Sequence, residues 1–257
     1  MKLLTWNVSL TPWNFSRKKF RSLIASSLIQ KNADIILLQE VFFTDDFEYL
    51  KKTLSKQGFT EFLHNKNLLT ISKVPFISDN YRNFTAQGLF FSWAMLDRLY
   101  KKGWQVVQIK IKDELIYIIN THTLSAYGHD EGDYTETRKK QIIEIIDFLD
   151  KQRAEKFILA GDFNFDKDSE TYDFLKQTYD LDDPLASLPD KTITSENLRR
   201  RRFNIKKMEQ RVDHFFVKGL ESNKMEGKIV FNKPWKINGV TTHPSDHYGL
   251  GLQIDLK

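Results

Sequence analysis

The chain has 257 residues, of which 40% are hydrophobic and 28% charged, a length that allows one large domain or two small ones around a sizeable core. Cysteine is absent, which excludes disulfides and thiolate metal sites, so any metal must be held by oxygen or imidazole ligands. The net charge of +5 is compatible with a polyanionic partner such as nucleic acid, a phosphoinositide head group or an anionic membrane surface.

Membrane and targeting signals are missing from the sequence as it stands. No apolar run reaches the roughly 20 residues needed to cross a bilayer. Leu3-Leu4 follows Lys2, but Asn7 and Ser9 interrupt anything like a secretory core. We therefore expect a cytoplasmic monomer, although a leader removed before this start would leave no trace.

The first third of the chain alternates between strand and helix patterns. Phe20, Ile24 and Leu28 recur at helical spacing and Asn32 closes that run, while Ile35 to Leu38 is a continuous apolar stretch typical of a buried strand. The pattern predicts a strand over 1–8, a helix over 16–32, a strand over 33–40 and a helix from about 44 to 58.

Short β-like runs follow and then helices return. Lys112-Asp113-Glu114 reads as the tip of a hairpin, and Ile142, Ile145 and Leu149 mark the clearest helix. The predicted strands are 59–63, 68–72, 88–96, 104–112, 115–120, 156–162, 212–217, 228–232 and 248–255, and the predicted helices are 135–151 and 169–177. With no linker and no repeat, we expect one α/β (α+β) domain over 1–257, with helices covering sheets from outside.

One strand end past the middle of the chain concentrates polar groups. The apolar run 156–160 stops at Gly161 and then presents Asp162 and Asn164, which extended backbone can point to the same side. A carboxylate and an amide held together suit a hard cation and a phosphate. The alternative is an ordinary polar turn.

Polar side chains recur at the ends of other apolar strands. Taken singly, each has a plain structural explanation: Asn7 as a turn former, Glu40 as a solvated strand end, His122 as a hydrogen-bonded core histidine, and Asp213 as a partner of a nearby basic residue. Together they lie where α/β folds place their sites, at strand carboxyl ends or beside the closing strand. The residues concerned are Asn7, Glu40, His122, Asp162, Asn164, Asp213, Asp246 and His247.

These positions carry a family resemblance. The chain resembles the endonuclease/exonuclease/phosphatase superfamily, whose members are metal-dependent phosphohydrolases with a four-layer α-β-β-α sandwich of two mixed sheets. The motifs stand in the family order and span residues 5 to 247. They are Thr5-Trp6-Asn7, Leu38-Gln39-Glu40, Asn120-Thr121-His122, Gly161-Asp162-Phe163-Asn164, Arg211-Val212-Asp213 and Ser245-Asp246-His247.

The resemblance implies a metal site. Glu40 is expected to bind Mg²⁺ directly with Asn7 close by, and Asp246 is a further candidate ligand. Mg²⁺ takes a few carboxylate or amide oxygens and keeps several waters. Mn²⁺ is the alternative ion.

The resemblance also implies catalytic roles for five residues. Asp162 would orient or deprotonate the attacking water, and Asn164 would fix that water and a phosphate oxygen. Asp213 would hold the second nitrogen of His247, which meets the phosphate as donor or general base. His122 would donate to a non-bridging oxygen as charge builds up. Whether Asp162 or His247 is the base stays open at this point.

Several segments favour the neutral sphingomyelinase-like branch. Lys102-Gly103-Trp104 and Ser72-Lys73-Val74-Pro75 resemble segments of those enzymes, and apurinic-site endonuclease branches lack a histidine at the His122 motif. The expected substrate is accordingly a phosphodiester, with a phospholipid head group or nucleic acid on the phosphate.

A basic segment supports a DNA or RNA nuclease as the alternative function. Its six cations could contact phosphates or an anionic membrane, or form a solvated loop. They are Arg199, Arg200, Arg201, Arg202, Lys206 and Lys207. The further alternatives are an inositol or nucleotide phosphomonoesterase and a non-catalytic binding module on the same fold.

Overall fold

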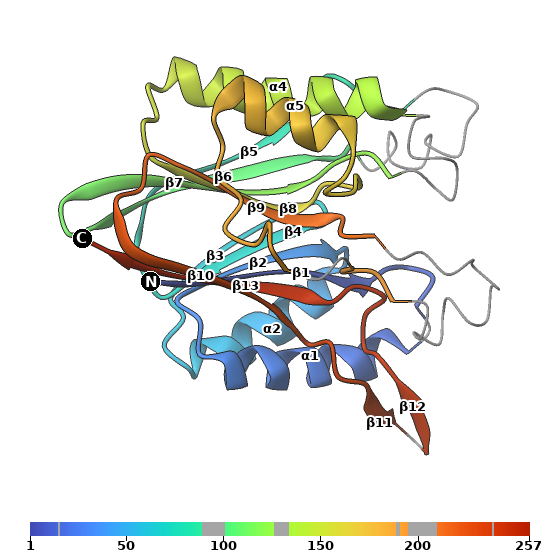
Figure 1. Ribbon diagram of the computed structural model, residues 1–257. Helices are drawn as coiled ribbons and strands as arrows, with labels where there is room; N and C mark the ends of the chain where they lie inside the picture. The colour runs from blue at the N-terminus through green and yellow to red at the C-terminus, as the bar shows by residue number, and fades with distance from the viewer. Residues whose placement is uncertain (15, 89–100, 126–133, 189–190, 195–209, 238) are drawn as a thin grey trace.

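The computed structural model stacks four layers, with two β-sheets face to face and a helix pair on each outer side (Figure 1). It describes the whole chain except residues 15, 89–100, 126–133, 189–190, 195–209 and 238. Helices α1 (Arg17–Lys31) and α2 (Thr44–Ser55) cover one sheet, and α4 (Thr135–Lys151) and α5 (Glu170–Tyr179) cover the other. The α/β sandwich expected from the sequence is confirmed.

Each sheet mixes parallel and antiparallel pairs. The first has the order β10 (Ser222–Val230), β13 (Gly249–Leu256), β1 (Lys2–Leu10), β2 (Ile35–Val41), β4 (Leu68–Ser72) and β3 (Glu61–Asn65). The second has the order β5 (Phe76–Asn83), β6 (Gly103–Ile111), β7 (Glu114–His122), β8 (Phe157–Asp162) and β9 (Asp213–Lys218). The parallel pairs are β1 with β2 and β7 with β8, near the middle of each sheet.

Three apolar clusters hold the layers together. One lies between the first sheet and α1–α2, one between the two sheets, and one between the second sheet and α4–α5. Strand β8 shows how the period-two alternation feeds two of them. Ile158 and Ala160 belong to the central cluster, whereas Phe157 and Leu159 belong to the outer one.

The same alternation predicts which face the polar strand ends occupy. Counting in steps of two from Ile158 reaches Asp162, from Ile118 reaches His122, and from Phe215 reaches Asp213. These side chains therefore continue the inner faces of the second sheet, at the point where the apolar filling between the sheets stops.

Some elements differ from the sequence-based expectation. Strand β5 was not predicted, because its residues are mostly exposed and polar and lack an apolar alternation. The hairpin of β11 (Trp235–Ile237) and β12 (Val240–Thr242), which projects from the body in Figure 1, has strands too short to register as a pattern. Strand β10 begins at Ser222 rather than 228 because its first residues are polar. The expected strand over 88–96 lies almost wholly outside the described residues.

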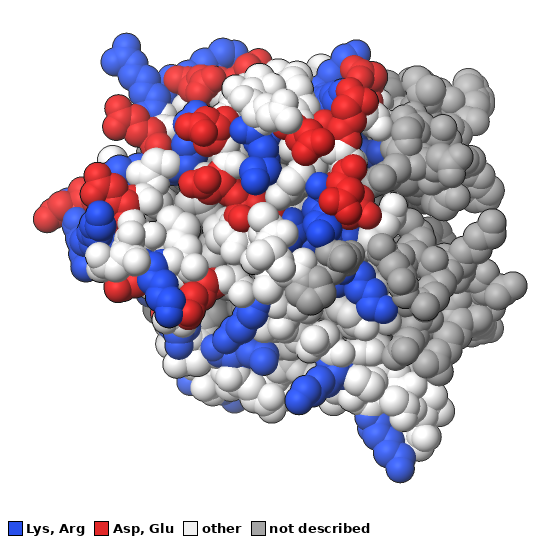
Figure 2. Space-filling view, in the orientation of Figure 1, with Lys and Arg blue, Asp and Glu red and all other residues white. Residues whose placement is uncertain are grey.

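Charge is unevenly spread over the face seen in Figure 2. Acidic and basic side chains are interspersed over the α4–α5 layer, whereas the lower part of the view shows mainly basic ones. Within the described part of the chain, no helix is long and apolar enough to cross a bilayer.

Candidate active site

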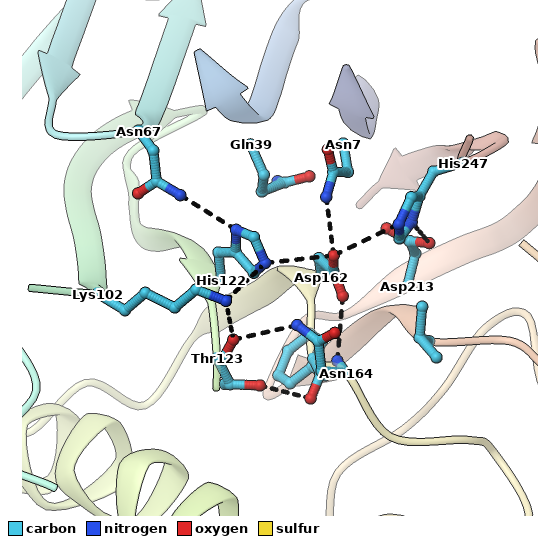
Figure 3. A network of polar contacts seen from close by, with 12 residues as sticks. Asn7, Gln39, Asn67, Lys102, His122, Thr123, Asp162, Asn164, Asp213 and His247 are labelled. Atoms are coloured by element: carbon cyan, nitrogen blue, oxygen red, sulfur yellow. Dashed lines mark hydrogen bonds and ion pairs between the residues drawn. The ribbon is translucent and has the colours of Figure 1, made fainter. Parts of the chain in front are cut away.

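Asp162 is the centre of the polar network drawn in Figure 3. Its carboxylate accepts a 2.9 Å hydrogen bond from Nδ2 of Asn7 and a 3.0 Å bond from the backbone N–H of Asn164. The side chain is almost completely buried. Burial raises the pKa of this carboxyl above its ordinary value, and the nearby His247 opposes part of that rise. Asp162 is thus a stronger base than an exposed aspartate.

His247 is held between two carboxylates. Its Nδ1 lies 2.9 Å from Oδ2 of Asp213, and its Nε2 lies 3.8 Å from Oδ2 of Asp162. Burial by itself lowers the pKa of an imidazole, but the two carboxylates outweigh it and raise the pKa of His247 to about 10. The imidazole is therefore a cation at neutral pH, with Nε2 as the donor that faces Asp162.

His122 has the opposite electrostatic surroundings. Its Nε2 lies 3.0 Å from Nζ of Lys102 and 3.5 Å from Oδ2 of Asp162, and Asn67 Nδ2 lies 3.1 Å from its Nδ1 (Figure 3). Burial, the Lys102 ammonium and the positive charge of His247 hold the pKa of His122 well below its usual range. The ring is neutral, so it can serve as a hydrogen-bonding group but not as a standing positive charge.

Asn164 closes the second side of Asp162. It has a left-handed φ of 51°, a conformation that asparagine tolerates better than most residues, and its Nδ2 donates to the backbone oxygen of Thr123 at 3.1 Å. Lys102 Nζ donates to the same oxygen at 2.8 Å. The loop after β7 and the loop after β8 are thereby joined beside Asp162.

The segment before β13 is anchored on the end of β1. Ser245 Oγ donates to the backbone oxygen of Asn7 at 2.6 Å, and the indole Nε1 of Trp6 donates to the backbone oxygen of His247 at 2.9 Å. Thr194 N donates to the backbone oxygen of Asp246 at 2.8 Å. These bonds hold Asp246 and His247 next to Asn7, near the carboxyl end of β1.

Glu40 lies on the strand beside Asn7. Gln39 is the register partner of Asn7, and Glu40 follows it with a left-handed φ of 62°, which breaks the regular alternation of β2. Gln39 itself faces the second sheet, because its Nε2 donates to Oδ1 of Asn120 at 2.8 Å. Such a backbone outlier at a strand end is typical of functional sites.

A cation fits this set of side chains. Asp162, Asp213 and His247 have ligand atoms within 4.8 Å of one another, and Oδ1 of buried Asp213 has no hydrogen-bond partner among the residues that the structure describes. The carboxylates of the set offer oxygen ligands without sulfur, which suits a hard ion. The ion has two candidate positions, this group and Glu40 at the end of β2, and we favour Glu40 because Nδ1 of His247 already pairs with Asp213.

Direct contacts bring together six of the eight residues that the sequence singled out: Asn7, His122, Asp162, Asn164, Asp213 and His247. Glu40 adjoins them on β2, next to the register partner of Asn7, and Asp246 adjoins them in the segment just before His247. The basic cluster of Arg199, Arg200, Arg201, Arg202, Lys206 and Lys207 lies outside the described residues.

Sequence reasoning left two contributors unassigned. Lys102 stands in the segment Lys102-Gly103-Trp104, which was noticed as a resemblance but given no role, although its Nζ reaches both His122 and the Thr123 backbone. Asn67 stands between two short predicted strands, and nothing local indicates that its amide contacts a histidine 55 positions away.

Comparison with known proteins now decides the family. The family model described as "Endonuclease/Exonuclease/phosphatase family" matches residues 4–247. The chain belongs to the endonuclease/exonuclease/phosphatase family. It contains the six motifs in that family's order, and the site just described is built from them.

Relatives of this family member point to one branch of it. The chain is 26% identical to "Putative neutral sphingomyelinase" of Drosophila melanogaster over all of its own length and 61% of the relative's. It is also 26% identical to "Sphingomyelinase C" of Leptospira interrogans, over 96% of this chain and 50% of that protein. The chain thus spans less than two thirds of either relative. The sphingomyelinase-like resemblance is confirmed.

A solved structure shows the same family fold. The F277A, P278A mutant of the Staphylococcus aureus beta toxin, determined with bound magnesium ions, has a TM-score of 0.79 and 20% identity. The match covers 98% of both chains. At this identity the likeness concerns the fold, and the bound magnesium is a property of that protein.

Proposed function

We propose that this chain is a metal-dependent phosphodiesterase of the phospholipase C type, closest in action to sphingomyelinases. The observation that carries the proposal is the buried group of Asp162, Asp213 and His247, with a neutral His122 and a Lys102 ammonium on its other side. The relatives named sphingomyelinase support the choice of a lipid phosphodiester.

The two raised pKa values suggest a division of labour. Asp162, whose pKa is raised, takes the proton of the attacking water while Asn164 N and Asn7 Nδ2 fix its orientation. His247, a cation held by Asp213, donates from Nε2 to the phosphoryl oxygen that gains charge. This assignment makes Asp162 the base and His247 the electrostatic donor.

On the opposite side of Asp162, a cation and a neutral ring face the site. The Lys102 ammonium is buried and donates to Nε2 of the neutral His122, so this cation stands beside Asp162 and can face a non-bridging phosphate oxygen. Because water is largely excluded here, each such contact stabilises the transition state more than the same contact would at the surface.

The metal site of the proposal consists of oxygen ligands. Glu40, with Asn7 and Asp246 adjoining, would hold Mg²⁺, with Mn²⁺ as the alternative. When bound, the ion supplies positive charge to the phosphate oxygens and to the leaving alcohol. Asp162 would take up the proton of the attacking water, and His247 would donate from Nε2, as described above.

A nuclease is the second candidate, for one reason only. The segment with Arg199, Arg200, Arg201 and Arg202 could neutralise several nucleic-acid phosphates, and binding of that kind would weaken steeply with salt. A phosphomonoesterase has no comparable observation in its favour.

A substrate panel tests the proposal. The full chain with Mg²⁺ or Mn²⁺ would be assayed on bis-p-nitrophenyl phosphate, sphingomyelin vesicles, plasmid and single-stranded DNA, RNA and inositol phosphates. We expect hydrolysis of the chromogenic diester and of the lipid, with loss of about 100-fold or more in His247→Ala and Glu40→Ala. Intact activity in either variant would refute the site assignment, and preferential cleavage of DNA or RNA would favour the nuclease.

A further inference from the structure

The candidate active site is divided between the two sheets. Asn7 and Glu40 lie on β1 and β2, and Asp246 stands in the segment just before β13, so the proposed metal ligands all belong to the first sheet. His122 and Asp162 are the last residues of β7 and β8 in the second sheet. The distance between the proposed metal ligands and the proposed base therefore depends on how the two sheets are aligned.

The apolar filling between the sheets does not by itself fix this alignment. It consists of buried side chains such as Leu37, Ile118 and Ile158. The hydrophobic effect is non-directional, and cores tolerate rearrangement of apolar side chains as long as their volume is kept. A hydrogen bond, by contrast, weakens steeply when its angle departs from the ideal. Directional contacts are therefore better suited to hold one sheet at a defined position against the other.

Two buried amides make such a contact directly behind the site. Nε2 of Gln39 on β2 donates to Oδ1 of Asn120 on β7 at 2.8 Å and to Oγ1 of Thr5 at 3.0 Å. Gln39 lies beside Asn7 in Figure 3, as their register pairing requires, and Asn120 precedes His122 by two positions. Both amides are fully buried. We call Gln39 and Asn120 the inter-sheet amide pair.

A third amide continues the contact towards the edge of the first sheet. Nε2 of Gln105 on β6 donates to the backbone oxygens of Leu63 at 2.9 Å and Leu68 at 3.1 Å, on β3 and β4. Its Oε1 accepts from Oγ1 of Thr70 at 2.7 Å. The turn of the β3–β4 hairpin holds Asn67 against the imidazole at the end of β7. Gln105 thus fixes a second element of the first sheet against the second sheet.

Stability alone does not explain these amides. Burial of polar groups is unfavourable unless every donor and acceptor finds a partner, and an apolar pair of similar size would avoid that requirement. Oε1 of Gln39 is buried and has no hydrogen-bond partner within the described part of the chain. What an amide pair provides, and an apolar pair does not, is one preferred position of the two strands.

We propose that the inter-sheet amide pair aligns the two halves of the active site, holding the metal ligands of the first sheet at a working distance from His122 and Asp162 of the second. The inference rests on the proposed phosphodiesterase function and adds to it the residues that set its geometry. Gln39 and Asn120 are positioning residues, because they act through the strands that carry Glu40 and His122.

Replacement of one amide and then of both separates positioning from stability. The variants are Asn120→Leu, Gln39→Met and the double variant Gln39→Met/Asn120→Leu, which restores a matched apolar pair. Ile118→Val is the control, since it loosens the apolar filling on the same strand, two positions from Asn120. For each protein, kcat and KM on bis-p-nitrophenyl phosphate with Mg²⁺ would be measured at 25 °C, together with Tm in Mg²⁺ and in EDTA.

Each single replacement should lower Tm by roughly 5 °C, because it leaves a buried amide without its partner. The kcat should fall by about 10- to 100-fold while KM stays within about threefold of wild type, since misplacement of about 1 Å is enough for such a loss. The rise of Tm in Mg²⁺ should persist in Asn120→Leu, because the metal ligands remain together on the first sheet.

The double variant gives the decisive result. With no amide left unpaired it should regain most of the Tm, yet its kcat should remain low, because an apolar pair does not fix the alignment. It also carries the test should a single variant fail to fold. Ile118→Val should keep a kcat close to that of wild type.

Three outcomes would overturn the proposal. These are a double variant with the kcat of wild type, a loss of kcat in Ile118→Val as large as in the double variant, and loss of the Mg²⁺-induced rise of Tm in Asn120→Leu, which would assign the amide to the metal site itself. A wild-type chain that cleaves no phosphodiester would instead refute the proposed function.

Discussion

His122 and His247 flank Asp162 with oppositely shifted pKa values, although both are buried histidines. Burial lowers the pKa of each imidazole, and the difference comes from the next neighbour. His247 has the carboxylate of Asp213 at its Nδ1, while His122 has the ammonium of Lys102 at its Nε2. The chemical role of a residue in this site is therefore set by its partner.

Removal of the Asp213 charge should shift the pH profile. In Asp213→Asn the pKa of His247 falls from about 10, because the carboxylate that holds the proton at Nδ1 is neutralised. If His247 must be protonated, activity is lost as pH rises through that pKa. The alkaline limb of kcat/KM on bis-p-nitrophenyl phosphate should move down by about 1–2 pH units. Asp79→Asn, an exposed change on β5, is the control, and an unmoved limb would argue against a cationic His247.

His214 makes a separate prediction about stability. It lies among Phe163, Phe165 and Phe216. Burial, and to a smaller extent the positive charge of Arg211, lower its pKa from 6.5 to about 3. Between those values the unfolded chain binds the proton more readily than the folded one, so stability falls as pH drops below 6.5. The residue should account for about 2 kcal/mol of stability lost between pH 7 and pH 5.

Urea unfolding at the two pH values measures this contribution. His214→Phe cannot take up the proton, so its free energy of unfolding should fall by about 2 kcal/mol less than that of wild type over the same interval. Its stability at pH 7 is not the readout, because the hydrogen bond of the ring to the backbone oxygen of Phe165 is also lost. An equal acid loss in both proteins would contradict the prediction.

At the scale of elements, the parallel pair β7–β8 places the two central side chains. Thr121 pairs with Gly161, and His122 pairs with Asp162. Gly161 has a φ of 145°, and a Cβ on it would lie 2.0 Å from the backbone oxygen of Thr121. Only glycine lets the strands approach this closely, and that approach is what sets His122 3.5 Å from Asp162.

Gly161→Ala should therefore affect both stability and activity. The backbone of β7 must move, which we expect to cost about 2–4 kcal/mol in urea unfolding and to reduce kcat strongly, since His122 moves with it. Gly58→Ala is the matched control, because Gly58 also has a positive φ, of 83°, but has nothing within 4 Å of the added carbon. It should cost only about 1 kcal/mol and keep its activity. Similar losses in both variants would mean that the backbone conformation, not the contact, is responsible.

At the scale of the whole molecule, the site is the polar end of an apolar sandwich. The inner faces of both sheets form one buried cluster and then continue into Asn7, His122, Asp162 and Asp213. Figure 2 shows mixed charge over the α4–α5 layer and mainly basic side chains in its lower part, in agreement with a net charge of +5.

Metal binding should stabilise the whole fold. An ion bound only by the folded chain at 100 times its Kd adds about 2.7 kcal/mol, which raises Tm by roughly 5–10 °C for a domain of this size. Thermal unfolding in excess Mg²⁺ and in EDTA measures the shift. Glu40→Gln should abolish it, and Glu221→Gln, an exposed change between β9 and β10, should retain it. An undiminished shift in Glu40→Gln would place the ion elsewhere.

The order of helices and strands was readable because apolar residues recur at period 2 in strands and 3.6 in helices, and the α1 stop at Asn32 matches its left-handed φ of 47°. Strand β5 and the β11–β12 hairpin were not predicted, because a polar edge strand and three-residue strands show no such periodicity. That residues 1–257 fold as a single domain stays a prediction.

By itself, the sequence determined the family, the sandwich fold and the polar strand ends, because motif order and periodicity are properties of the chain. Only the tertiary structure decided which residues meet. Asn7 and Asp162 are 155 positions apart, and Lys102 and Asn67 reach His122 from separate elements. The pKa shifts of His122 and His247 follow from those meetings, since electrostatic interaction depends on distance in space and on exclusion of water.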